Sequence, residues 1–254
     1  MSRLSILLRK DLLEQWRTYH LPVVALVFLV FGLGSPILAK YTPELLAHSG
    51  GNVQITVPTP TTADAVESFL SNSGSVSAFA AILLAMSTVA RERERGTAAL
   101  VLSKPVSRTA FLGSKFAALL VTLGVSVIIG GLADYAYTAA LFNTMSAPGF
   151  AACCLLILLE TMVFAAVTFF ASTLIGSTLP AAGVGLGTYF VTAIIGIDPT
   201  AGHAMPGGLE APAKALALGQ SAPHLWTSLG FNVLWVALCL VGAWLVFQRQ
   251  ELGS

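Results

Sequence analysis

Ionisable side chains are scarce in this sequence, and their positions decide where chemistry is possible. Only 10% of the 254 residues are charged, yet six of the 13 lysines and arginines fall within residues 91–115. Two acids, Asp134 and Glu160, instead stand at the end of a long apolar run and inside another. Ionisable groups are costly inside a membrane, so if these runs cross one, both acids are candidates for a functional role.

Each of the two acids also has a structural interpretation. Glu160 falls near the middle of its apolar run, where it either forms a hydrogen bond that fixes helix packing or lines a substrate path. Asp134 falls beside Tyr135 and Tyr137, which favours an anchor at the membrane interface. Replacement of Glu160 by Gln would lower transport if the residue lines a path and would disturb assembly if it fixes packing.

The sequence contains no motif for ATP hydrolysis or for metalloprotease chemistry. Neither G-x-x-x-x-G-K-[ST], whose backbone cradles phosphates, nor H-E-x-x-H occurs in it. The nearest glycine-rich string, "GVGLG", has no strand before it. Its outer glycines, Gly183 and Gly187, form a G-x-x-x-G that is typical of close helix packing in membranes. We therefore expect no catalytic or cofactor-binding residue in this chain.

The cysteines and histidines do not predict a metal site. The three cysteines stand in apolar runs without paired spacing, as free cysteines in protein interiors usually do. His48, His203 and His224 fall outside the apolar runs, with Met205 and Glu210 near His203, but no H-x-x-x-H spacing is present. We expect these three to be ordinary loop histidines.

Membrane spans are the elements that must position these residues. The mean hydropathy is +0.81 and 56% of the residues are hydrophobic, whereas about a quarter of a soluble domain is charged. Several runs approach or reach the roughly 20 residues needed to cross a hydrocarbon core of about 30 Å. The sequence predicts an all-α polytopic membrane protein with six transmembrane helices, over residues 21–39, 75–90, 109–133, 150–175, 179–197 and 229–247.

The connections between the spans indicate their orientation. Two long connections, about 40–74 and 198–228, are too polar or too often broken by Pro and Gly to cross a bilayer. Within them, residues 63–70 and 211–218 have the periodicity of short helices that would cap an outer mouth. With a cytoplasmic N-terminus, 11 of the 13 Lys and Arg residues fall on the cytoplasmic side and only Lys40 and Lys214 outside. This fits the positive-inside rule, so we expect a cell (inner) membrane protein with both termini cytoplasmic.

Residues 1–20 form a unit of their own before the six-span domain of 21–254. Leu4, Leu8 and Leu12 repeat at four-residue spacing and Trp16 continues the row, while the charged residues fall largely elsewhere on the helical wheel. This pattern predicts an amphipathic helix that lies on the inner leaflet.

The charged stretch 91–108 is the predicted cytoplasmic loop between the second and third spans. If span two continues as a helix, two pairs of opposite charge become neighbours three residues apart, Arg91/Glu94 and Glu92/Arg95. Gly96 suits the end of that helix, and a short apolar run, 97–103, follows before Pro105. Positive-inside bias accounts for the charge. The apolar run still needs the membrane surface, the spans or a groove on a partner to bury it.

Three stretches resemble the permease subunits of the type-2 ABC exporters, a family that includes permeases linked to multicopper-enzyme maturation and antibiotic resistance. They are "LLRKDLLEQWRTY", "VPTPTTADAVESFLSN" and "ARERERGTAALVLSKPVSRTAFLGSK". The third is the most specific, because a charged cluster, Gly-Thr, a short apolar run, a Pro and a Gly-x-Lys join the second and third spans in such permeases. Beyond about Leu141 the resemblance rests on span count and hydrophobicity.

The resemblance implies roles for the N-terminal helix and the charged loop. The N-terminal segment would be an elbow helix, and the loop would be a coupling helix that docks into a groove of a separate cytosolic ATPase. Residues 91–95 would flank the ATPase surface and 97–103 would insert into it. The coupling residues would then be Arg91, Glu92, Arg93, Glu94, Arg95, Gly96, Thr97, Leu100, Leu102, Lys104 and Pro105.

The resemblance also implies partners. Two copies of the ATPase would bind ATP and Mg²⁺, which this chain does not bind. A second permease, identical or related, would complete the pathway within the membrane lipid. No nucleic acid is expected.

Two other classes of protein stay open. A secondary transporter would be expected to show internal repeats, broken helices and paired charges at mid-membrane. The sequence shows no convincing repeat and a single mid-membrane acid, Glu160. A non-enzymatic membrane scaffold also fits the composition, and it would differ by having no ATPase partner in the purified complex.

Overall fold

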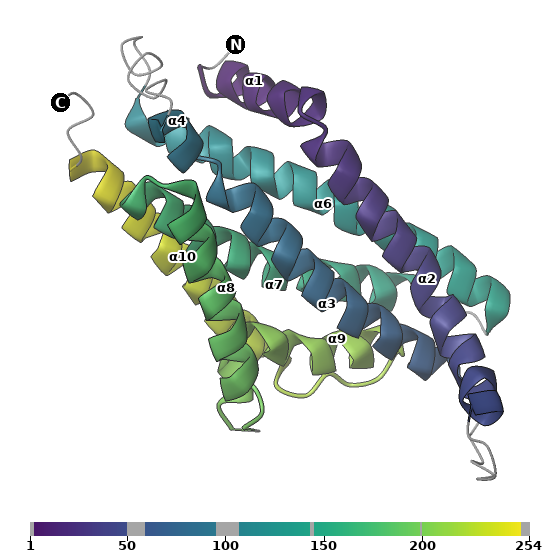
Figure 1. Cartoon of the computed structure of the whole chain (residues 1–254). Helices are drawn as coiled ribbons and strands as arrows, with labels where there is room; N and C mark the ends of the chain where they lie inside the picture. Colours follow the sequence, from purple (N-terminus) through teal and green to yellow (C-terminus); the bar gives the residue numbers. More distant parts are fainter. Residues whose placement is uncertain (1–2, 50–58, 95–106, 143–144, 199, 250–254) are drawn as a thin grey trace.

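The computed structural model describes residues 3–49, 59–94, 107–142, 145–198 and 200–249, and every regular element in these ranges is helical (Figure 1). The helices are α1 (Arg3–Arg17), α2 (His20–Ser49), α3 (Thr62–Met86), α4 (Ala90–Glu94), α6 (Arg108–Leu141), α7 (Ala147–Ile175), α8 (Thr178–Ile195), η1 (Gly202–Ala204), η2 (Pro206–Leu209), α9 (Glu210–Ala217) and α10 (Leu225–Arg249).

Six helices of the described chain are long and apolar enough to cross a membrane, which confirms the predicted all-α polytopic fold. The spans are His20–Thr42, Thr62–Glu94, Arg108–Leu141, Ala147–Ile175, Thr178–Ile195 and Leu225–Arg249. Figure 1 shows α1, α4 and the last turns of α10 at one end of the bundle and α9 at the other. We call these the α4 end and the α9 end.

The first predicted outer connection was too long. We expected a loop over about 40–74, but α2 continues to Ser49 and α3 already begins at Thr62. Asp64 fixes this start, because its carboxylate accepts hydrogen bonds of 2.7 Å from both the backbone N–H and the hydroxyl of Thr61. Polar residues lower the hydropathy of the first turns of α3, yet their opposite face is buried through Val66 and Phe69.

The two short helices predicted near the outer mouth differ in outcome. Residues 63–70 are the first part of α3 rather than a separate helix. Residues 211–218 fall largely within α9, a separate helix that packs against α7. Within the predicted 198–228 connection, η1, η2 and the start of α10 are also helical.

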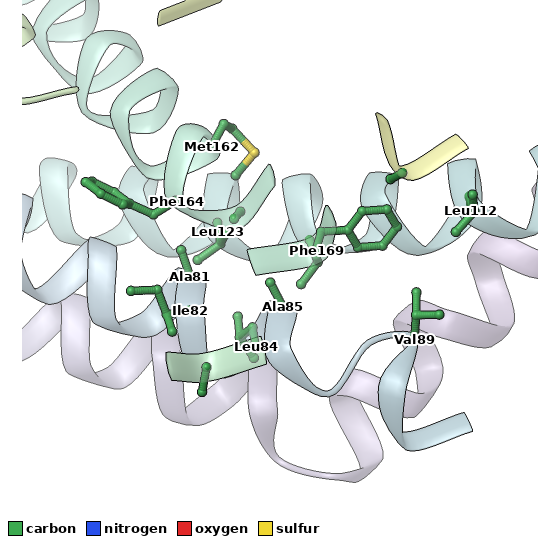
Figure 2. Close-up of a cluster of buried hydrophobic side chains, with 14 of the residues drawn as sticks. Ala81, Ile82, Leu84, Ala85, Val89, Leu112, Leu123, Met162, Phe164 and Phe169 are labelled. Carbon is green, nitrogen blue, oxygen red and sulfur yellow. The ribbon is translucent and has the colours of Figure 1, made fainter. Parts of the chain in front are cut away.

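The core forms around α7, which packs against α3, α6, α8, α9 and α10. Near the α4 end, a continuous cluster joins α3, α6, α7, α8 and α10 through buried side chains that include Ile82, Leu119, Phe169 and Phe247. Figure 2 shows part of this cluster, with Ala81, Ile82 and Ala85 of α3 facing Met162, Phe164 and Phe169 of α7. Alanines at the crossing let the two helices approach closely.

Helices α2 and α6 touch through their backbones. A Cβ atom at Gly32 would overlap the carbonyl oxygen of Gly130, and one at Gly130 would lie 2.7 Å from the carbonyl oxygen of Phe28. Only glycine permits an approach this close. The α2–α6 contact is therefore fixed by two positions without side chains.

Candidate functional site

The α4 end holds the described part of the charged stretch. α3 ends at Met86, and three residues separate it from α4. Ser172 of α7 fills this break: its hydroxyl accepts from the backbone N–H of Ala90 at 2.9 Å and donates to the carbonyl of Met86 at 3.0 Å. A buried helix break is stable only when its freed backbone groups find partners, so Ser172 sets the place where α4 begins.

Two charged residues of α4 join α7 to α8. Arg93 donates from Nη1 to the carbonyl oxygen of Thr173 at 2.9 Å, in the last turn of α7. Glu94 accepts from the backbone N–H of Thr178 at 2.9 Å and from its hydroxyl at 2.8 Å, in the first turn of α8. A cation at a helix C-terminus and an anion at an N-terminus are the arrangement that the helix dipole favours.

The turn between α7 and α8 has space for Arg93 because it contains glycine. Gly176 caps α7 with a φ of +69°, the left-handed conformation that glycine adopts without strain. A Cβ atom at this position would lie 2.6 Å from the guanidinium carbon of Arg93. Any larger residue would therefore displace the arginine that holds α4 to α7.

The remaining acid of α4 connects it to α1 and α6. Glu92 Oε1 lies 2.8 Å from Lys115 Nζ and 3.6 Å from Lys10 Nζ. Asp11 lies 3.6 Å from Lys10 and 3.9 Å from Lys115, and it accepts a 2.8 Å hydrogen bond from the hydroxyl of Ser114. We call Lys10, Asp11, Glu92 and Lys115 the ion cluster.

The ion cluster is charge-balanced and largely shielded from solvent. The side chains of Lys115 and Asp11 are only 7% and 8% exposed. Burial works against the charged form of Lys10, but the carboxylates of Glu92, Asp11 and Glu14 outweigh it and raise the pKa of this lysine. The charged form of Lys10 is thus favoured, and the ion pairs of the cluster hold α1, α4 and α6 together.

Sequence reasoning missed the ion cluster. Asp11 is the most buried side chain described in α1, although the interpretation of this helix rested on its leucines. The missed signal was Lys115, a basic residue inside the predicted third span, which needed an acidic partner there. Sequence reasoning also missed the contact that Arg108, at the start of α6, makes with the end of α10. Its guanidinium donates hydrogen bonds to the carbonyl oxygens of Phe247 and Gln248 at 2.9 and 2.8 Å and so caps the C-terminus of α10.

The predicted elbow helix is present as α1, and its predicted apolar row is only half-buried. Leu8 and Leu12 are half-buried and Trp16 is 60% exposed, while the side chain of Leu4 lies outside the described residues. The chain turns at Tyr19, whose φ is +61°, and enters α2 directly. The contact of α1 with the membrane surface stays a prediction.

The predicted coupling residues are described only in part. Arg91 to Glu94 form most of α4, whereas Arg95, Gly96, Thr97, Leu100, Leu102, Lys104 and Pro105 lie outside the described residues. Glu94, expected to pair with Arg91, binds Thr178 instead, and no Arg91–Glu94 ion pair forms within the described part of the chain.

The α9 end contains a polar cavity of about 350 Å³ between α3, α7, α8 and the η1–α9 segment. Its lining includes Ser75, Glu160, Tyr189, His203 and Glu210. Glu160 is only 6% exposed, and no described residue donates a hydrogen bond or forms an ion pair with its carboxylate. Burial raises the pKa of Glu210. The structure therefore places the predicted mid-membrane acid beside a second acid that the sequence did not connect with it.

Asp134 is separate from this cavity. It is completely buried, and both of its carboxylate oxygens are without a hydrogen-bond partner in the described residues. An interfacial anchor would be exposed, so this position is at odds with the tyrosine-belt interpretation. The structure does not bring Asp134 and Glu160 into one site.

The outer-loop histidines are not isolated from one another. The rings of His203 and His224 stack with centroids 4.1 Å apart and an interplanar angle of 22°. The side chain of His48 lies outside the described residues. In the described ranges, the carboxylates of Asp11, Glu14 and Glu92 are the one group of three metal-type ligands that converge, and each of them lies within 4.0 Å of Lys10 or Lys115.

The glycines predicted to pack α8 face away from the rest of the chain. A Cβ atom at Gly183 or Gly187 would meet nothing within 4 Å, whereas one at Gly185 would overlap the hydroxyl of Thr168. The intermediate glycine is therefore the one that packs α8 against α7 and α3. The close helix packing predicted for Gly183 and Gly187 stays a prediction.

Comparison with known proteins gives two matches. Residues 74–252 match the family described as "ABC-2 family transporter protein". The chain is also 30% identical over 257 aligned residues to an uncharacterized transmembrane protein, YxlG of Bacillus subtilis (strain 168), with 99% of each chain covered. The family match includes α4 and all later spans, and so it reaches the second half of the chain, where sequence motifs were lacking.

Proposed function

Because the chain belongs to the family of ABC-2 transporter proteins, we propose that it is the permease subunit of an ATP-driven exporter, energised by a separate cytosolic ATPase. The protein is a membrane protein with six helices able to span a bilayer. The single observation that carries the coupling part of this proposal is α4, whose side chains bind α1, α6, α7 and α8 at once.

The position of α4 suits a coupling role. It lies directly before the predicted docking segment, so a force on that segment reaches α4 first. Glu92 passes the displacement to α1 and α6, Arg93 passes it to α7, and Glu94 passes it to α8. A rigid-body motion of these helices then opens or closes the pathway.

The ion pairs of α4 are strong enough to transmit a displacement to the neighbouring helices. Removal of one partner from a buried ion pair costs about 3–5 kcal/mol, whereas coupling free energies between sites are typically about 1–3 kcal/mol. The Glu92–Lys115 pair is largely buried. Displacement of α4 therefore moves α6 before it breaks the pair.

A second permease completes the pathway in this proposal. α8 exposes large apolar side chains, among them Leu179, Phe190 and Ile194, and Gly183 and Gly187 present open positions on the same helix. Small residues beside apolar ones permit close packing of a second helix in the membrane. The partner is a second copy or a related permease, and each of the two binds one ATPase.

The charge distribution sets the proposed orientation. By sequence, 11 of the 13 lysines and arginines fall in the segments predicted to be cytoplasmic, and α1, α4 and the last turns of α10 lie at the α4 end (Figure 1). The positive-inside rule places it in the cytoplasm. The ATPase, with its ATP and Mg²⁺, binds there.

The proposal is tested by co-purification with the native neighbours of the protein. The parent is expected to retain a cytosolic ATPase, and a variant with Leu100→Asp and Leu102→Asp is expected to lose it, because charge in the predicted apolar run prevents docking. The matched control carries Leu45→Asp and Leu46→Asp, two leucines near the C-terminal end of α2, which falls in the predicted outer connection and away from the ATPase. All variants are checked for helix content by circular dichroism.

An ATPase absent from the parent complex would contradict the proposal, and a secondary transporter or a scaffold would then be the better account. An ATPase retained by the folded Leu100/Leu102 variant would place the docking surface elsewhere.

A further inference from the structure

The cavity at the α9 end is built around two carboxylates. Glu160 comes from the middle of α7, and Glu210 is the first residue of α9. Their Oε1 atoms converge on Gly74 of α3: a Cβ atom there would lie 3.2 Å from that of Glu210 and 4.0 Å from that of Glu160. α3 leaves this space open because it has a glycine at the point of convergence.

No lysine or arginine of the described chain neutralises this pair within the cavity, and the one histidine in the lining, His203, stacks on His224. The lining contains no lysine or arginine, and Lys214, the nearest lysine in sequence, is paired with Glu67. Glu160 is only 6% exposed, and its carboxylate has no hydrogen-bond or ion-pair partner among the described residues. The Glu160 carboxylate therefore faces the cavity without a charged partner from the described chain, which leaves a place for a bound group to supply one.

The cavity also has an aromatic wall held in a fixed position. Tyr189 packs against Phe164 and Phe79, with ring centroids 5.6 and 5.2 Å apart. Its hydroxyl lies 3.3 Å from the Ser75 hydroxyl. An aromatic face near a negative charge is the environment that binds organic ammonium groups.

We infer that this cavity is the binding site for an organic cation, a molecule that carries an ammonium-type charge on an apolar body. The charge lies between Glu160 and Glu210, and the body lies against Tyr189 and Phe164. The inference rests on the proposed function, because it names the substrate class of the pathway that the spans form.

Two observations favour an organic cation over a metal ion. The volume of about 350 Å³ falls within the range of small-molecule pockets, roughly 300–1,000 Å³, and a bare ion would leave it mostly empty. In addition, no three carboxylate or histidine ligands of the described cavity converge within 4.8 Å of one another. A metal site requires several such ligands.

Direct binding to the purified permease, without any ATPase, tests the inference. The probe is tetraphenylphosphonium, an apolar cation, titrated calorimetrically in detergent, with tetraphenylborate as the anion of matched shape. The parent is expected to bind the cation and not the anion. Glu160→Gln and Glu210→Gln are each expected to weaken cation binding by at least about tenfold. Glu67→Gln removes a carboxylate from the same end, outside the cavity lining, and is expected to leave binding unchanged.

Three results would overturn the inference. Equal affinity for the cation and the anion would mean that the cavity selects only apolar bodies. Unchanged binding in both Gln variants would mean that the probe binds elsewhere. Displacement of the probe by stoichiometric Mg²⁺ or Ca²⁺ would identify a metal site. If Glu160→Gln fails to fold, Glu210→Gln, at the edge of the bundle, tests the same cavity.

The binding test separates this inference from the exporter proposal. Cation binding without a co-purified ATPase would keep the site and reject the ATP-driven mechanism. A co-purified ATPase without cation binding would keep the exporter and reject this substrate class.

Discussion

The two ends of the bundle treat their buried charges in opposite ways. At the α4 end, Glu92 and Asp11 face Lys115 and Lys10 within 4 Å. At the α9 end, Glu160 has no cation among the described residues. The described charges of the ion cluster are thus paired within this chain, as a coupling role would require, whereas the unpaired Glu160 suits the proposed binding site.

The strongest test of this contrast between the two ends is to remove Lys115, the cation at the centre of the ion cluster. Lys115→Met leaves the carboxylates of Glu92 and Asp11 without their most buried partner, and it should lower the free energy of unfolding by about 3–5 kcal/mol. Lys10→Met is the matched control, because Lys10 is 46% exposed and a pair this exposed contributes about 1 kcal/mol or less. Unfolding in mixed detergent micelles measures both. Equal effects would show that the cluster acts as a surface network.

A charge-neutral substitution applied to each end sharpens the contrast. Glu92→Gln weakens the 2.8 Å contact with Lys115 and should cost about 1.5–3 kcal/mol. Glu160→Gln loses no partner in the described structure, so stability should stay within about 0.5 kcal/mol of the parent or rise. Melting curves in the same detergent compare the two. A larger loss for Glu160→Gln would mean that this carboxyl group fixes helix packing.

The smallest effects on stability are expected for the glycines of α8, where a glycine packed against other helices lies between two glycines that face open space. Gly185→Ala brings a Cβ atom onto the Thr168 hydroxyl and to 3.0 Å from Ile82 Cγ2, which should cost about 1–3 kcal/mol. Gly183→Ala and Gly187→Ala meet open space and should change monomer stability by less than about 0.5 kcal/mol. Cross-linking in membranes should show weaker self-association for these two. Unchanged association would place the dimer contact on another helix.

The sequence was most informative where a span is uninterrupted. The predicted 150–175 span agrees closely with α7, Ala147–Ile175. Its ends follow local rules: the Ser146 hydroxyl accepts from the backbone N–H of Gly149 at one end, and Gly176 adopts the left-handed conformation at the other. Local capping chemistry of this kind is visible in sequence.

Mean hydropathy did not predict a helical segment that is stabilised by packing against another helix rather than by its own apolar composition. The first turns of α3 were predicted as a short separate helix within an outer connection, because polar residues lower their mean hydropathy. They are helical because Phe69 packs against Phe150 of α7, with ring centroids 5.6 Å apart. Packing between segments distant in sequence is invisible to a window of neighbouring residues.

The candidate sites were predictable residue by residue but not as groups. Glu160 stands out in sequence because it interrupts an apolar run, whereas Glu210 becomes its neighbour only when the 198–224 segment folds back toward α7. Asp11 and Lys115 are likewise far apart in sequence and in contact in space. A single sequence identifies costly residues, and only coordinates show which of them meet.

The close approach of the backbones at Gly32 and Gly130 would limit how the proposed transport cycle can proceed. Because glycine has no side chain that could change its rotamer, the two backbones cannot adjust at this crossing. α2 and α6 would therefore move as one rigid unit, and neither could slide past the other without first separating. α8 differs, since large apolar side chains such as Leu179 and Ile194 are exposed in the described chain. In the proposed transport cycle, a displacement that α4 passes to α6 would therefore carry α2 with it as one unit, while the exposed face of α8 would stay available for a second permease.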